Sequence, residues 1–140
     1  MDNKLFDDKR IAEGYAKDRP WLHPLVMEQI KNDCCIKEKF KNGLDVGCGA
    51  GLSTKALKLI CEKVTGTDIS EEMITVCKRL YTEPDYRFYT AKAEETKIPE
   101  KQYDIVTAAG VINWVDREKF LQNMSQVMVK DGYLIIYDFW

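Results

Sequence analysis

The chain has 140 residues, 45% of them hydrophobic and 31% charged, with a formal net charge of −2. Such a chain can bury one core of ordinary size, so we expect a single globular domain. The small net charge argues against a nucleic-acid partner, and no apolar run approaches the ~20 residues of a membrane span. The first ten residues are charged throughout, unlike a secretory signal, which makes the cytoplasm the expected location.

The expected elements begin with two helices and then alternate between strand and helix. The helices span 7–17 and 23–33, the second with Pro24 in its first turn. The elements that follow are strand 43–47, helix 51–61, strand 63–68, helix 70–81, strands 86–90 and 103–108, helix 116–129 and strand 133–138. This alternation predicts an α/β fold with a parallel sheet, whose ligands bind at the carboxyl ends of the strands.

The most informative segment is 44–51, which reads Leu-Asp-Val-Gly-Cys-Gly-Ala-Gly. Its three glycines let the backbone turn sharply and approach a ligand, and the helix that follows presents its N-terminal amides to anionic groups. The dinucleotide fingerprint G-x-G-x-x-G would need glycine at position 52, where Leu52 stands. The pattern therefore indicates a nucleotide-type cofactor loop, and a tight turn without a ligand is the alternative.

Asp68 ends the next expected strand, about 20 residues after the first glycine, where a βαβ unit presents an acid to a ribose diol. Asp68 could instead cap the following helix, but Ser70 with two glutamates after it fits that position better. Ile69 and Met73 are placed to pack on a flat purine. Core packing is an equal alternative for Met73.

These motifs resemble those of the class I S-adenosylmethionine (SAM)-dependent methyltransferases, in particular the small-molecule, type 11 enzymes of the ubiquinone-biosynthesis and trans-aconitate methyltransferase kind. Further matching segments are 15–20 (YAKDRP), Ala93-Glu94, 103–110 (YDIVTAAG) and 131–137 (DGYLIIY). The resemblance implies a Rossmann-like doubly wound sheet, mostly parallel and in strand order 3-2-1-4-5, with SAM as cofactor and a small-molecule methyl acceptor. The implied cofactor-binding residues are Tyr15, Arg19, Asp45, Gly47, Cys48, Gly49, Gly51, Asp68, Ile69, Met73, Ala93, Glu94 and Ala109.

The same resemblance suggests roles for several of these residues. Tyr15 and Arg19 would close the site, and the planar donor fork of Arg19 suits the methionine carboxylate. Asp45 would orient the methionine end, directly or through loop amides. Asn113 and Trp114 would form the acceptor wall, with core packing an equal alternative for Trp114. No catalytic residue is expected, because displacement at a sulfonium methyl needs mainly alignment and exclusion of water.

Three departures from the family pattern stand out. Lys92 occupies the place of an acid that accepts from the adenine amino group in many relatives, so backbone groups or Glu94 would take over that contact. Asn113 stands where several relatives have histidine, which removes the most obvious general base. The chain reaches Trp140 after the fifth strand, whereas relatives continue through two more strands. We therefore expect a truncated fold that self-associates through the edge at 133–140.

Together these features predict one SAM-binding methyltransferase domain over 1–140, with a helical N-terminal cap over about 1–40. Two alternatives remain. One is a SAM-binding module or enzyme fragment without turnover. The other is a nicotinamide-dependent oxidoreductase, against which Leu52 and the lack of a Tyr/Lys or His/Arg catalytic set argue.

The five cysteines form no C-x-x-C pair, which argues against a metal site or a disulfide framework, and we interpret all five as reduced, buried residues. The single histidine, His23, is interpreted as structural or exposed rather than catalytic.

Overall fold

The computed structural model describes residues 22–95 and 102–138. Its five strands form one sheet in the order β3-β2-β1-β4-β5, and all four neighbouring pairs are parallel. The strands are β1 (Phe40–Val46), β2 (Cys61–Asp68), β3 (Tyr86–Thr90), β4 (Tyr103–Ala109) and β5 (Met128–Tyr137). The predicted parallel sheet and strand order are confirmed. The expected helix over 7–17, with Tyr15, and Arg19 beyond it, lie outside the described residues.

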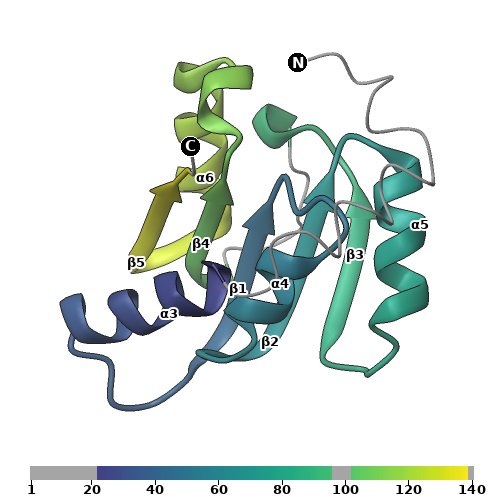
Figure 1. Ribbon diagram of the computed structural model, residues 1–140. Helices are drawn as coiled ribbons and strands as arrows, with labels where there is room; N and C mark the ends of the chain where they lie inside the picture. The colour runs from purple at the N-terminus through teal and green to yellow at the C-terminus, as the bar shows by residue number, and fades with distance from the viewer. Residues whose placement is uncertain (1–21, 96–101, 139–140) are drawn as a thin grey trace.

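Helices cover both faces of the sheet, as a doubly wound fold requires. They are α3 (Leu22–Asp33), α4 (Leu52–Leu57), α5 (Glu71–Leu80) and α6 (Arg117–Val127), with two short 3-10 turns, η1 (Ala93–Glu95) and η2 (Ile112–Trp114). Figure 1 shows α3, α4 and α5 on the near side of the sheet and α6 behind β4. No helix among the described residues is long and apolar enough to cross a membrane.

The core consists of one layer on each side of the sheet. The layer under α3 and α4 includes Met27, Ile30, Leu57, Ile60, Val64 and Ile105. The layer under α6 includes Leu44, Val46, Val106, Phe120 and Met124. Because helices cover both faces, the central strands are buried on both sides, and Leu44 and Val46 of β1 and Val106 of β4 have no exposed surface. The carboxylate of Asp45 is a polar exception within β1.

The structure corrects three predicted boundaries, the first being the start of β1, which lies at Phe40 and not at residue 43. The helix expected over 51–61 ends at Leu57 and closes with i→i−3 bonds, because Ile60 already accepts a hydrogen bond from the Phe40 N–H and Cys61 pairs with Phe40 as the start of β2. The last strand, expected from residue 133, begins at Met128. In β5 the four residues between Met128 and Tyr133 stand opposite a single residue of β4. The bulge accommodates the turn-like residues before Tyr133 within the strand, and those residues were the reason for expecting the strand to begin later.

The cysteines also differ in part from expectation. Cys48, Cys61 and Cys77 are buried and all described cysteines are free thiols, as predicted. Cys35, however, is exposed, and Cys34 is only half-buried. Both follow the end of α3, where the chain turns and Cys35 has a positive φ of 52°.

Candidate cofactor site

A loop of left-handed glycines joins β1 to α4. Gly47, Gly49 and Gly51 have φ values of +68°, +55° and +100°, a region that residues with a side chain rarely adopt. Gly51 donates to the Cys48 carbonyl and accepts from Lys55, so a tight turn leads directly into the helix. The loop lies beyond the arrowhead of β1 in Figure 1, at the carboxyl edge where α/β folds bind ligands.

Two of these glycines are also required by contacts within the chain. A Cβ at Gly47 would overlap the side chain of Val111, and one at Gly51 would lie 2.5 Å from the ring of Tyr81 and 3.2 Å from Cys77 Sγ. The expected reason for these glycines was close approach to a ligand. At Gly47 and Gly51 neighbouring side chains already account for them, and the Val111 contact brings the end of β4 against the loop.

Asp45 is fully buried beneath this loop. Its carboxylate accepts from the hydroxyls of Ser53 (2.5 Å), Thr54 (2.8 Å) and Thr107 (2.9 Å), which ties β1 to the start of α4 and to β4. Burial raises the pKa of Asp45 to about 6, against the lowering effect of the three hydrogen bonds. The two roles expected for Asp45 were direct contact with the methionine end and contact through loop amides. Its side chain has no exposed surface, and these hydrogen bonds come from hydroxyls on α4 and β4 instead of loop amides.

Asp68 connects the end of β2 to the loop. Its Oδ2 accepts from the Gly49 N–H and its Oδ1 from the Ser70 N–H, both at 2.9 Å. The Ser70 hydroxyl accepts from the Met73 N–H, which confirms that Ser70 caps α5. Each carboxylate oxygen can accept more than one hydrogen bond, so a diol can still donate to Asp68.

The other residues expected around an adenosine differ in exposure. Ile69, beside Asp68, is 39% exposed, whereas Met73 is 1% exposed and packs with Ala50 and Val76. The environment of Met73 is therefore that of a core residue. Cys48 uses its backbone within the protein, because its N–H donates to the Thr67 carbonyl and its C=O accepts from Gly51.

The segment after β3 reaches across to α6. Ala93 packs against the core layer under α6, and Glu94 accepts from the Asp116 N–H at 3.3 Å. This contact places η1 at the N-terminus of α6. Lys92 is exposed.

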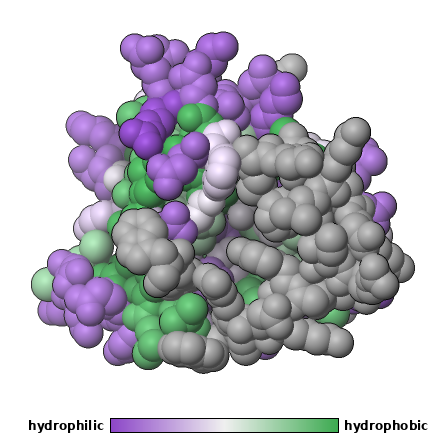
Figure 2. Space-filling model, turned by 45° about the horizontal axis from the view of Figure 1, so that its top comes forward, coloured by the Kyte–Doolittle hydropathy of each residue, from purple (hydrophilic) through white to green (hydrophobic). Residues whose placement is uncertain are grey.

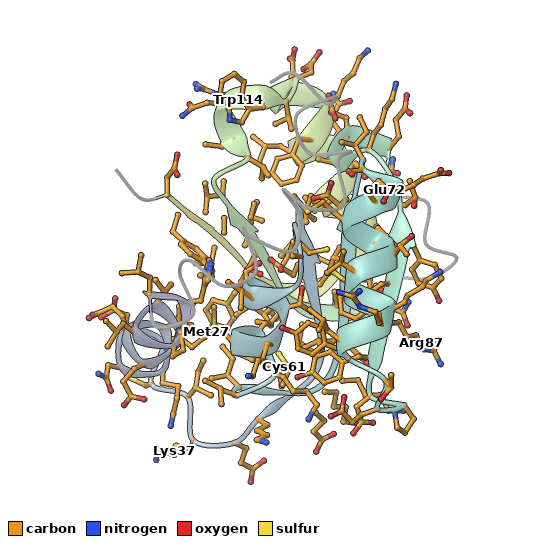
Figure 3. The ribbon with its side chains drawn as sticks, turned by 45° about the vertical axis from the view of Figure 1, so that its right-hand side comes forward. Met27, Lys37, Cys61, Glu72, Arg87 and Trp114 are labelled. Carbon is orange, nitrogen blue, oxygen red and sulfur yellow. The ribbon has the colours of Figure 1, made fainter. Side chains whose placement is uncertain are left out.

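The segment after β4 presents an exposed aromatic ring. Ala109 is half-buried at the end of β4, and Gly110 donates to the Tyr137 carbonyl at 2.8 Å. Trp114 is 58% exposed, so core packing does not explain it, and Figure 3 shows it beyond the carboxyl ends of the strands. Arg117 donates to the side chain of Asn113 at 3.1 Å and thereby holds this turn.

The structure brings together some of the predicted residues and separates others. Gly49 and Asp68 are in direct contact, and Gly47 meets the end of β4 through Val111. Trp114 lies on η2, where its N–H donates to the Val111 carbonyl at 2.9 Å. Among the described residues, no cluster of histidine, cysteine or acidic side chains could hold a metal ion.

Sequence reasoning missed the hydroxyls that hold Asp45 and the thiol that reaches the loop. The hydroxyls are those of Ser53, Thr54 and Thr107, and the thiol is that of Cys77, which donates to the Gly49 carbonyl. The signal available in the sequence was a polar side chain between apolar neighbours. Thr107, in the middle of the apolar run of β4, is the clearest example.

The profile of one family, described as a methyltransferase domain, matches residues 44–136. The chain belongs to this methyltransferase family. It is 30% identical over 119 residues to a ubiquinone biosynthesis O-methyltransferase of Hydrogenovibrio crunogenus, a match that covers 83% of this chain and 48% of that protein. A protein of the same name from Coxiella burnetii is 29% identical over 125 residues, which cover 86% of this chain and 52% of that one.

A SAM-dependent methyltransferase from Aquifex aeolicus shares the fold of this methyltransferase domain. The TM-score is 0.74 at 20% identity, over 92% of this chain and 71% of that one. SAM is the cofactor of this family and fold. The domain spans about half the length of the curated relatives it matches.

Proposed function

We propose that this methyltransferase domain transfers the methyl group of SAM to a small-molecule acceptor by direct displacement at the sulfonium. One observation carries the proposal: the Asp68 carboxylate binds the N–H of Gly49, a left-handed glycine of the loop, at the carboxyl ends of β2 and β1. This arrangement offers a hydrogen-bond acceptor for a ribose beside a close-approaching backbone. The family match over 44–136 supports SAM as the molecule that carries that ribose.

The described residues fit such a cofactor. The loop leads into the N-terminus of α4, and Asp68 is half-buried at the end of β2, beside the loop. Ile69, with 39% of its surface exposed, lies next to Asp68 and would pack on the adenine. The parts of the site that face the adenine and the methionine of SAM would be completed by Ala93, Glu94 and Ala109. The bound cofactor would be covered by Tyr15 and Arg19.

Each part of the site has a separate task in methyl transfer. When bound, SAM supplies an electrophilic methyl group on a positively charged sulfur. Asp68 would fix the ribose, and Asp45 would hold the loop through its three hydroxyl contacts, so that the acceptor and the methyl group stay aligned. A rigid, largely dry site performs most of this task, and we assign no general base.

Trp114 and Asn113 would form the acceptor wall. The exposed indole ring offers a flat apolar surface, and the contact between Arg117 and Asn113 keeps the turn in place. The names of the relatives from Hydrogenovibrio crunogenus and Coxiella burnetii, which concern ubiquinone biosynthesis, favour a small hydroxylated acceptor. A cytoplasmic location and the absence of a nucleic-acid partner remain predictions from the sequence.

A second candidate function is SAM binding without turnover. This function is favoured because the chain matches only about half the length of the relative from Hydrogenovibrio crunogenus. If the acceptor pocket of such a longer protein includes residues outside the matched half, methyl transfer would require those residues as well. Two measurements separate these functions. Calorimetric titration with SAM, S-adenosylhomocysteine and NAD tests the cofactor, and a radiolabelled-methyl assay over a panel of small phenols and carboxylates tests turnover. Binding of NAD but not SAM would contradict both functions.

A further inference from the structure

Two buried thiols converge on one carbonyl oxygen of the cofactor loop. Cys77 Sγ, on α5, lies 3.2 Å from the Gly49 carbonyl oxygen, and Cys48 Sγ lies 3.6 Å from the same atom. The two sulfur atoms are 4.0 Å apart. Cys77 is 0% exposed and Cys48 is 3% exposed, so water does not compete for this carbonyl from the thiol side.

Together with Asp68, the thiols hold both peptide units that flank Gly49. The peptide unit before its Cα is held by Asp68, which accepts from the Gly49 N–H. The peptide unit after its Cα is held by the thiols, which donate to the Gly49 carbonyl. Glycine has the least intrinsic backbone preference of all residues, and Gly49 has a φ of +55°. The backbone conformation of Gly49 is therefore set by side chains from β2 and α5, because glycine has no strong preference of its own.

We propose that Cys77 is a positioning residue for the cofactor: its thiol holds the Gly49–Ala50 peptide and, through Gly49, the carboxylate of Asp68. The inference rests on the proposed function, since it assigns a cause to the affinity of the same site. Because the peptide bond is trans, holding the Gly49 carbonyl toward Cys77 also directs the Ala50 N–H to the opposite side of the loop.

The environment of the Cys48 thiol supports donation rather than ionisation. Burial, with smaller contributions from Cys77 and the nearby carboxylates, raises the pKa of Cys48 well above its ordinary value, so its S–H persists at neutral pH. The surrounding cluster of Cys48, Ile74, Cys77 and Phe88 is otherwise apolar. Filling space there needs only an apolar side chain. The added property of a thiol at position 77 is its hydrogen-bond donor.

The test compares Cys77→Ala with Cys77→Ser, which differ by one hydroxyl donor. Affinity for S-adenosylhomocysteine is measured by calorimetry in the presence of a reductant, with the melting temperature of each variant without ligand. We expect Cys77→Ala to weaken binding by about tenfold and Cys77→Ser to recover most of that loss. Cys77→Val, which fills the space with an apolar side chain and has no donor, should weaken binding like Cys77→Ala, and it provides the comparison if the alanine variant folds poorly.

Cys61 is the matched control. It is also a buried thiol, at 0% exposure, but it begins β2 and lies at the opposite end of the sheet from Trp114 (Figure 3). Cys61→Ala should lower the melting temperature and leave the affinity unchanged. If Cys77→Ala binds as tightly as the parent, or if Cys77→Ser loses as much as Cys77→Ala, the thiol does not position the loop. A parent chain that binds no S-adenosylhomocysteine would instead overturn the proposed function.

Discussion

Two carboxylates at the ends of neighbouring strands have opposite environments. Asp45 is fully buried and accepts from three side-chain hydroxyls, whereas Asp68 is half-buried and accepts from two backbone N–H groups. Burial makes the first a structural acceptor inside the protein and leaves the second able to meet a ligand. The sequence distinguishes them only by position, because the hydroxyl of Thr107 that reaches Asp45 is 62 residues away.

Asp68 should contribute directly to cofactor affinity. A hydrogen bond to a charged group is worth about 1.5–3 kcal/mol, so Asp68→Ala should weaken binding of S-adenosylhomocysteine by at least about tenfold in calorimetry. Asp68→Asn keeps one acceptor oxygen and should lose less. Glu71→Ala, an exposed acid in the first turn of α5, controls for the loss of charge. Unchanged affinity in Asp68→Ala would rule out the ribose assignment.

Asp45 should make stability depend on pH. Folding raises its pKa from 3.8 to about 6, so the folded chain binds the proton more tightly than the unfolded chain. The stabilising contribution of the proton is fully present below pH 4 and is lost as the pH rises through about 6, a change of about 3 kcal/mol.

The comparison of the parent with Asp45→Asn isolates this effect. Urea unfolding at pH 7 and at pH 4.5 gives two free energies of unfolding for each protein. On going from pH 7 to pH 4.5, the free energy of unfolding should rise more, or fall less, in the parent than in the variant. All other titrating groups are shared, so the difference between the two proteins reports on Asp45. The same pH dependence in both proteins would show that Asp45 does not titrate in this range.

At the scale of elements, the sequence predicted every strand but not every boundary. Alternating apolar runs and glycine turns indicate where a strand exists, and the crossovers of a doubly wound fold then determine its neighbours. The start of β5 was missed because Lys130-Asp131-Gly132 looks like a turn, with Asp131 at a φ of +66°, although the sheet incorporates it as a bulge. Local residues do not specify whether a partner strand extends past such a segment.

The loop between β1 and α4 allows binding and folding to be separated. We expect Gly49→Val to abolish cofactor binding, because a branched side chain at a φ of +55° both strains the backbone and occupies the approach to the ligand. Gly51→Ala should instead lower the melting temperature, since its Cβ would lie 2.5 Å from the ring of Tyr81. A Gly49→Val chain with normal melting and parental affinity would mean that the loop is only a turn.

At the scale of the whole molecule, the described sheet has two outer strands, β3 and β5. Seen from the carboxyl ends, the described surface mixes hydrophobic residues with hydrophilic ones (Figure 2). On β5, Tyr133 is 39% and Ile136 is 41% exposed. An outer strand offers its unpaired N–H and C=O groups to another chain, and apolar side chains on it favour such pairing.

We therefore expect the chain to self-associate through β5 as its concentration rises, while cofactor binding persists because Gly49 and Asp68 lie at β1 and β2. Light scattering over a concentration series measures the first part, and calorimetry the second. Ile136→Lys should restore the monomer without changing the affinity for S-adenosylhomocysteine, because a charge on an outer strand opposes edge pairing. Thr75→Lys, on the exposed side of α5, adds the same charge elsewhere and should leave association intact. A parent chain that stays monomeric at high concentration would show that the edge of β5 does not pair.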